Sequence, residues 1–149
     1  MGKVGLMLVV LALAAGCGSV SQQSGLSVGR VTLEVTGGFT GWDRILTVEA
    51  DGTARLQVVR GPSPPAGSHL VEPATIERLH SLVSDPAFAQ LKEAYLPPPG
   101  GADLQDYIVT AVVDGHTIKT MSRDGANPPA ILRDVLSILN SILATSTAR

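Results

Sequence analysis

The chain has little cysteine and few aromatic residues. Cys17 is the single cysteine among 149 residues, which excludes an internal disulfide and any metal site built from several thiolates. Aromatic side chains make up 3% of the sequence, so each of them is a candidate core anchor or contact residue. They are Phe39, Trp42, Phe88, Tyr95 and Tyr107.

The sequence also lacks clusters of positive charge. It has 11 Lys and Arg against 13 Asp and Glu, a formal net charge of -2. Nucleic-acid binding depends on clustered Lys and Arg that neutralise phosphates, so we expect no nucleic-acid partner. A composition that is 44% hydrophobic and 16% charged supports a packed core, and the length suits one domain.

The longest apolar stretch lies at the start of the chain. It runs over the 12 residues 4–15, directly after Lys3. A helix that spans a bilayer needs about 20 apolar residues, so this stretch is too short to cross. Its length and its preceding positive charge are typical of a secretory signal peptide.

The leader ends in Leu13-Ala14-Ala15-Gly16-Cys17, which resembles the bacterial lipobox. The resemblance implies cleavage between Gly16 and Cys17 and acylation of Cys17, with palmitate or a similar chain. Ordinary cleavage after Ala14, which leaves a free thiol, is the alternative. We therefore expect a signal peptide over 1–16, a flexible tether over 17–29, and a protein held on the cell membrane facing outside the cytoplasm.

Residues 30–149 are expected to form a single α+β domain. Alternating apolar residues predict strands from Arg30, over 42–49 and over 53–60, and two further strands over 106–113 and 116–121. Helical periodicity predicts a helix from Pro73 to about Ser84, a short turn starting at Pro86, and a last helix capped by Asn127 and starting at Pro128. The expected architecture is an antiparallel sheet of about five strands with two or three helices packed on one face.

The loop between the second and third strands can be predicted in more detail. A two-residue Asp51-Gly52 turn would pair Val48 with Arg55, which mixes an apolar and a charged residue on one face. A three-residue loop with Gly52 left-handed pairs Val48 with Ala54 instead. The hydrophobic pattern therefore favours the bulged three-residue loop.

No set of residues indicates catalysis. His69, His80 and His116 lack the spacing of metal ligands. Asp103 and Asp106 could in principle form an acid–base pair, but they flank a Pro/Gly loop where Asp is common for turn formation. We expect no enzyme activity, no catalytic residue, no metal and no cofactor.

Contact residues are the remaining candidates. Phe39 and Trp42 lie in a glycine-rich connection between two strands, where they either close one end of the core or form an exposed contact loop. His69 lies in a second loop, over 61–71, that is rich in Pro, Gly and Ser. It is a further candidate for contact with a partner.

The order of these parts resembles the emfourin family, which are small α/β inhibitors of protealysin, a thermolysin-like zinc protease. The resemblance covers residues 30–143. It rests on Val-Thr-Leu-Glu-Val-Thr-Gly-Gly-Phe-Thr-Gly at 31–41, the helix with Leu79 and Val83, Asp106-Tyr107 leading to Val113-Asp114-Gly115, and the last helix over 129–143.

The resemblance implies that a loop occupies the cleft of a secreted metalloprotease and offers it an apolar side chain. Phe39 and Leu70 are the candidates for that side chain. A different reading of the same chain is an envelope lipoprotein with a structural or accessory role, bound to protein or glycan.

Overall fold

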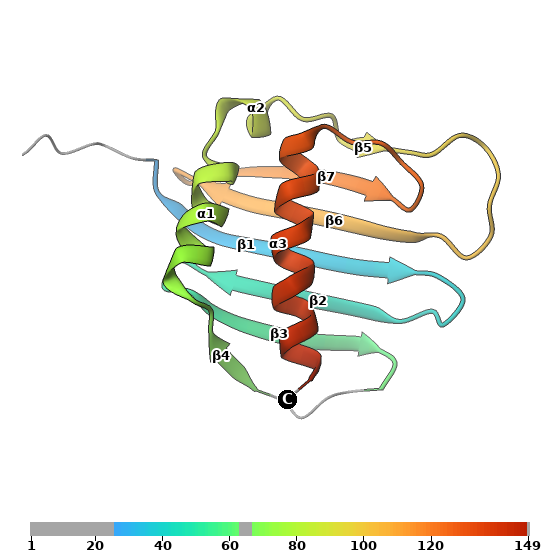
Figure 1. The fold of residues 1–149 in the computed structure, drawn as a ribbon, viewed down its shortest axis with the longest axis horizontal. Coiled ribbons are helices and arrows are strands. Elements are labelled where there is room, and N and C mark those ends of the chain that lie inside the picture. The colour runs from blue at the N-terminus through green and yellow to red at the C-terminus, as the bar shows by residue number, and fades with distance from the viewer. Residues whose placement is uncertain (1–25, 63–66, 149) are drawn as a thin grey trace, which may run out of the picture.

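The computed structural model describes residues 26–62 and 67–148. A single mixed sheet forms one layer of the domain, and the helices form a second layer over one face of it (Figure 1). The expected leader and the lipidation site at Cys17 lie outside the described residues.

The sheet has seven strands in the order β4-β3-β2-β1-β6-β7-β5. Neighbouring strands are antiparallel except β5 and β7, which are parallel. The strands are β1 (Val28–Gly37), β2 (Asp43–Glu49), β3 (Thr53–Arg60), β4 (Ser68–Leu70), β5 (Ala94–Tyr95), β6 (Gln105–Val113) and β7 (His116–Arg123).

The α+β class and the five long strands are therefore confirmed, but the expected sheet of about five strands is too small. The two additional strands, β4 and β5, are only 3 and 2 residues long and lie at the sheet edges. Such short strands leave no periodic signal in the sequence, because alternation needs four or more residues to be recognised.

The central strand β1 begins at Val28 rather than at Arg30. A bulge between Val28 and Arg30 shifts the register with β6 and turns Val28 toward the core, where it is 8% exposed. Ser27 is also fixed: its backbone N–H donates to Asp114 Oδ1 at 2.7 Å, and Asp114 N donates to Ser27 O at 2.8 Å. The folded domain thus includes the last residues that the composition assigned to the tether.

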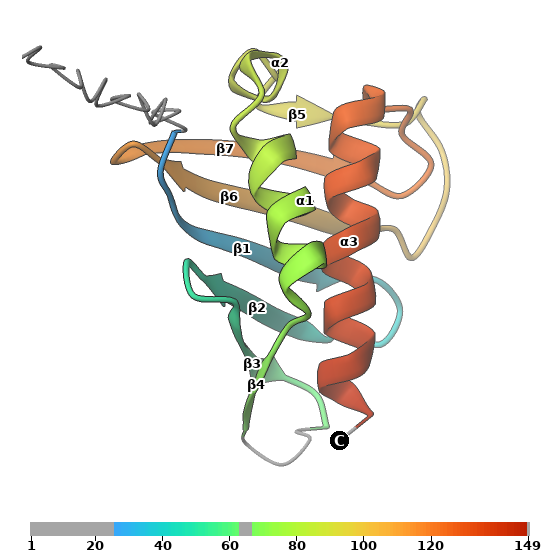
Figure 2. The same ribbon diagram turned by 60° about the vertical axis from the view of Figure 1, so that its left-hand side comes forward.

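The core lies between the sheet and two helices, α1 (Pro73–Val83) and α3 (Ala130–Thr147). Figure 2 shows both helices on the same side of the sheet, with α3 crossing the strands. Alternate residues of the strands meet them: Leu33 and Leu46 are fully buried, as are Leu79 of α1 and Leu139 of α3. Each such side chain contributes about 1.5–3 kcal/mol to folding.

Two of the three expected helix starts are confirmed. Helix α1 begins at Pro73, and the short α2 (Pro86–Ala89) is capped by Asp85, whose Oδ1 accepts from Ala87 N at 2.7 Å. The prediction that Asn127 caps the last helix was wrong, because α3 begins at Ala130. A residue that precedes proline is driven out of the helical region, and Asn127 and Pro128 each precede a proline.

The bulged hairpin between β2 and β3 is confirmed. Val48 pairs with Ala54 and Leu46 with Leu56, and Gly52 has a φ of 83°. Gly52 N donates to Glu49 O at 2.9 Å to close the turn. A side chain at Gly52 would be strained in this conformation and would also approach the core, since its Cβ would lie 3.2 Å from Ile76 Cγ1.

The other face of the sheet carries no helix (Figure 2). Thr32 of β1, Thr47 of β2 and Thr110 of β6 lie across from one another on this face. Strand β6 also places Ile108 and Val112 there, where both are half-buried. Among residues 26–62 and 67–148, no helix has the length and apolar character needed to cross a bilayer.

Candidate docking surface

Three loops meet at the end of the sheet where β1 finishes, which lies at the right of Figure 1. They cover residues 38–42, 96–104 and 124–129, and we call them the loop end. Gly38 N donates to Leu104 O at 3.1 Å, which joins the first loop to the second. Gly125 lies against Pro97, with an added Cβ only 3.4 Å from Pro97 Cβ, so the third loop contacts the second as well.

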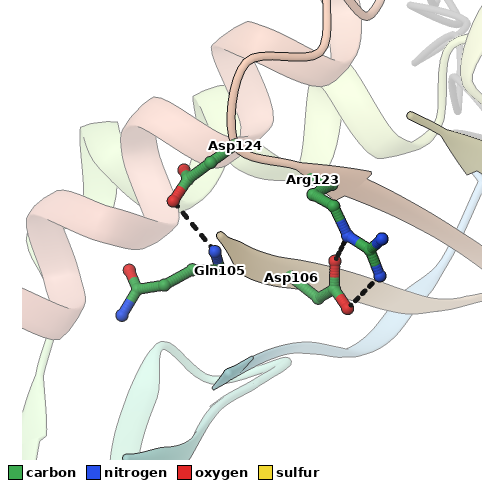
Figure 3. A network of polar contacts seen from close by, with 4 residues as sticks. All are labelled: Gln105, Asp106, Arg123 and Asp124. Atoms are coloured by element: carbon green, nitrogen blue, oxygen red, sulfur yellow. Dashed lines mark hydrogen bonds and ion pairs between the residues drawn. The ribbon is translucent and has the colours of Figure 1, made fainter. Parts of the chain in front are cut away.

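An ion pair on the helix-free face fixes the base of the loop end (Figure 3). Arg123 Nε and Nη2 donate to the two carboxylate oxygens of Asp106 at 2.7 and 2.9 Å. These hydrogen bonds, together with the charge of Asp106, raise the pKa of Arg123. Next to this pair, Gln105 N donates to Asp124 Oδ2 at 3.0 Å, which fixes the start of β6 to the end of β7.

This arrangement gives Asp106 a structural role. Its carboxylate is held by Arg123, whereas Asp103 is exposed in the preceding loop with a φ of 63°. No hydrogen bond joins the two carboxylates within the described part of the chain. In the same residues no three His, Cys, Asp or Glu side chains come together as a metal site would require.

Phe39 projects from the loop end with 87% of its surface exposed. Its loop is built on left-handed glycines: Gly37 and Gly38 have φ of 88° and 72°, and Gly41 N donates to Gly38 O at 3.0 Å. A Cβ on Gly37 would lie 2.9 Å from Leu104 O, so no other residue fits there without a shift. Of the two readings of Phe39, closing the core is therefore excluded.

Trp42 lies at the base of the same loop and is 36% exposed. A Cβ placed on Gly61 would be 2.8 Å from Trp42 Cδ1, so the indole lies directly against that backbone. The guanidinium carbon of Arg44 is 5.5 Å from the indole centroid, within the range of a cation–π contact. Trp42 is thus half-exposed and outside the buried cluster of the core.

Arg44 is a candidate contact residue that the sequence analysis missed. It pairs with Val35 and Val58, on the face of the sheet that the helices cover. Its Nε is enclosed and has no hydrogen-bond partner in the described residues. A signal was present in the sequence, because Arg44 occupies an inward position in the alternation that continues with Leu46 and Val48.

A cavity of about 360 Å³ lies between the end of the sheet and α3. Tyr107 and Asn140 are among its lining residues. Burial raises the pKa of Tyr107, and Asp124 acts in the same direction, so the phenol stays protonated at neutral pH. It donates a hydrogen bond to Gln105 Oε1 at 3.1 Å. The cavity therefore offers hydrogen-bonding groups to a ligand.

His69 and Leu70 lie at the opposite end of the sheet. Leu70 pairs with Thr53, the first residue of β3, and is 74% exposed. Both residues line a cavity of about 220 Å³ between the start of α1 and the last turns of α3. The structure therefore places the contact candidates in two separate pairs: Phe39 with Trp42, and His69 with Leu70.

Comparison with protein-family models and with curated proteins finds no match to this chain.

Proposed function

We propose that this protein is a lipid-anchored binding module outside the cytoplasm, and that its loop end inhibits a thermolysin-like metalloprotease by occupying the protease cleft. The observation that carries the proposal is Phe39, an aromatic side chain held almost fully exposed on a tight glycine turn. The resemblance of residues 30–143 to the emfourin family supports the same activity.

The turn that carries Phe39 is preorganised for binding. Burial of one aromatic side chain removes a large apolar area from water, but a mobile loop loses part of that gain when binding orders it. Here the turn is closed by the Gly41–Gly38 hydrogen bond and fixed to the neighbouring loop by the Gly38–Leu104 hydrogen bond. Phe39 can therefore enter an apolar pocket with little loss of backbone entropy.

The position of the proposed anchor is consistent with this role. The described chain enters the sheet at Ser27, beside the turn that joins β6 to β7, and β1 then leads away toward Phe39. A strand of the length of β1 spans about 30 Å. With lipid on Cys17 and at most about 35 Å of extended chain before Ser27, the loop end faces away from the anchored end of the domain.

Inhibition can be measured with the chain from Gly18 onward, which contains every described strand and helix. We expect it to block peptide cleavage by a thermolysin-like protease of the same organism. Truncation of a hot-spot residue costs about 2 kcal/mol or more, or about thirtyfold in affinity. Phe39→Ala should therefore weaken inhibition about thirtyfold without lowering the melting temperature, because Phe39 makes little contact with the core.

Two results contradict the proposal. If the wild-type protein leaves the protease fully active, the protein is not an inhibitor of it. If Phe39→Ala inhibits as well as the wild-type protein does, the contact with the protease lies outside the loop end.

The helix-free face supports a second candidate, an envelope lipoprotein that binds glycan. The Thr47–Thr32–Thr110 row lies between the cations Arg55 and Lys119 on this face, which places a row of hydroxyl groups between two positive charges. This function would be favoured if the protein binds purified cell-wall glycan, if Thr32→Lys abolishes that binding, and if Phe39→Ala leaves it intact.

A further inference from the structure

We infer that Arg44, on β2 directly after the loop end, binds a carboxylate of the partner with its guanidinium while an apolar pocket of the partner receives Phe39. The inference deepens the proposed function and rests on it for the choice of the loop end. It adds the chemistry of the partner: an acidic side chain next to an apolar pocket.

Among the described residues, no carboxylate lies within ion-pair distance of the guanidinium of Arg44. All 13 Asp and Glu residues lie within the described residues. The ion pairs among those residues involve Arg30, Arg60 and Arg123, and none involves Arg44. No hydrogen bond from Arg44 to any described residue exists either.

Its surroundings make this lack of partners costly. Arg44 is half-buried, and its Nε is enclosed without an acceptor. A buried donor without a partner destabilises a fold, and the cation–π contact with Trp42 offsets only part of that cost. The enclosed Nε stays unpaired when a partner binds, but a carboxylate on the Nη groups would compensate the positive charge, which no described carboxylate does.

The geometry favours a carboxylate as that partner. A guanidinium presents its N–H groups in a planar fork that matches the two oxygens of a carboxylate. Nε alone among the side-chain nitrogens of Arg44 is both enclosed and without an acceptor, so the Nη groups are the part that a partner can reach. Arg123 shows the same chemistry within the fold, where its Nε and Nη2 hold Asp106.

The neighbours of Arg44 are those of an interface hot spot. Trp42 lies under the guanidinium, and Phe39 projects from the same loop. Trp, Tyr and Arg are the residues most enriched at hot spots, and they gather at the centre of an interface. The charge of Arg44 near the start of β2 and the apolar area of the loop before it together select a partner that is complementary in both.

The test uses a blocked tetrapeptide, acetyl-Leu-Leu-Glu-Leu-amide, and its Gln counterpart, added to the chain from Gly18 onward. NMR reports two sites, the Arg44 Nε–H, which burial protects from exchange, and the Trp42 indole N–H. We expect saturable shifts of both signals with the Glu peptide. The Gln peptide should bind about fivefold more weakly, because it cannot form the ion pair. This factor corresponds to the strongest ion pairs measured between exposed residues.

Arg44→Lys separates the planar fork from the charge. We expect the melting temperature of this variant to change no more than a typical surface substitution changes it. The variant should lose the preference for the Glu peptide over the Gln peptide, measured from the Trp42 signal. Equal binding of the two peptides by the wild-type protein, absence of any shift at Arg44, or an unchanged Glu preference in Arg44→Lys would each overturn the inference.

The peptide experiment is independent of any protease. If the protein prefers the Glu peptide but does not inhibit the protease, the inference about Arg44 stands and the proposed function is wrong. If it inhibits the protease but shows no preference for the Glu peptide, the proposed function stands and the inference is wrong.

Discussion

Phe39 and Leu70 lie at opposite ends of the same sheet. Leu70 pairs with the first residue of β3, beside the end of β2, whereas Phe39 lies before the start of β2. The length of a strand therefore separates two side chains that are both well exposed. A protease cleft that binds Phe39 at the loop end therefore cannot also bind Leu70.

This separation makes Leu70→Ala a matched control for Phe39→Ala. Both changes remove an exposed apolar side chain, so neither should lower the melting temperature by more than a surface substitution does. We expect the inhibition constant to rise with Phe39→Ala and to stay within about twofold for Leu70→Ala. The opposite result would place the contact at the β4 end, with His69 and the cavity beside it.

The second prediction concerns Gly52 and Gly115, which share a left-handed backbone, with φ of 83° and 76°. An added Cβ at Gly52 meets Ile76, whereas at Gly115 nothing lies within 4 Å. Gly115→Ala should cost about 1–2 kcal/mol from the backbone alone, and Gly52→Ala about 1 kcal/mol more from the tight contact. Denaturant unfolding of both variants measures the difference, and equal losses would show that the core yields at Ile76.

The third prediction is a pH dependence from His80. Burial lowers the pKa of this side chain below 6.5, so the unfolded state binds a proton more readily than the folded state. The free energy of unfolding should therefore fall as the pH drops through the unfolded pKa. His80→Gln should reduce the loss between about pH 7.5 and about pH 5.5. If both proteins lose the same free energy of unfolding over this pH range, the pH dependence comes from the carboxylates and not from His80.

The fourth prediction tests the anchor at Cys17, which lies outside the described residues. If the lipobox is processed, Cys17→Ser removes the acylated thiol and with it the membrane affinity of the acyl chains. The wild-type protein should partition into the detergent phase and the variant should not, or it should keep its leader. Partitioning of both proteins into water would remove lipidation from the proposal.

The elements with a periodic pattern of apolar residues could be predicted from the sequence. The alternation in β1, β2 and β3, the bulged loop at Gly52 and the amphipathic helices follow from local patterns, because one face of each element must be buried. The short strands β4 and β5 could not be predicted this way. They form because their backbones reach the free edges of β3 and β7, which is a property of the assembled sheet.

The candidate surface was predicted only in part. The glycines around Phe39 indicated a tight connection but not whether its aromatic residues faced inward. That depended on residues further along the chain: Leu104, which accepts from Gly38 N, and Gly61, which lies against Trp42. Arg44 was missed because an isolated arginine in a strand is usually solvated, although its place in the alternation with Leu46 and Val48 put it on the inward face.

The central place of β1 has a consequence for when the protein can fold. Val31 pairs with Val48 nearby but also with Ala111, roughly eighty residues later, and closing a loop of that size costs about 4 kcal/mol in chain entropy. In the proposed exported protein the first strand to emerge thus lacks one neighbour until β6 has followed. If the protein is exported as proposed, the sheet can be completed only after β6 has crossed the membrane.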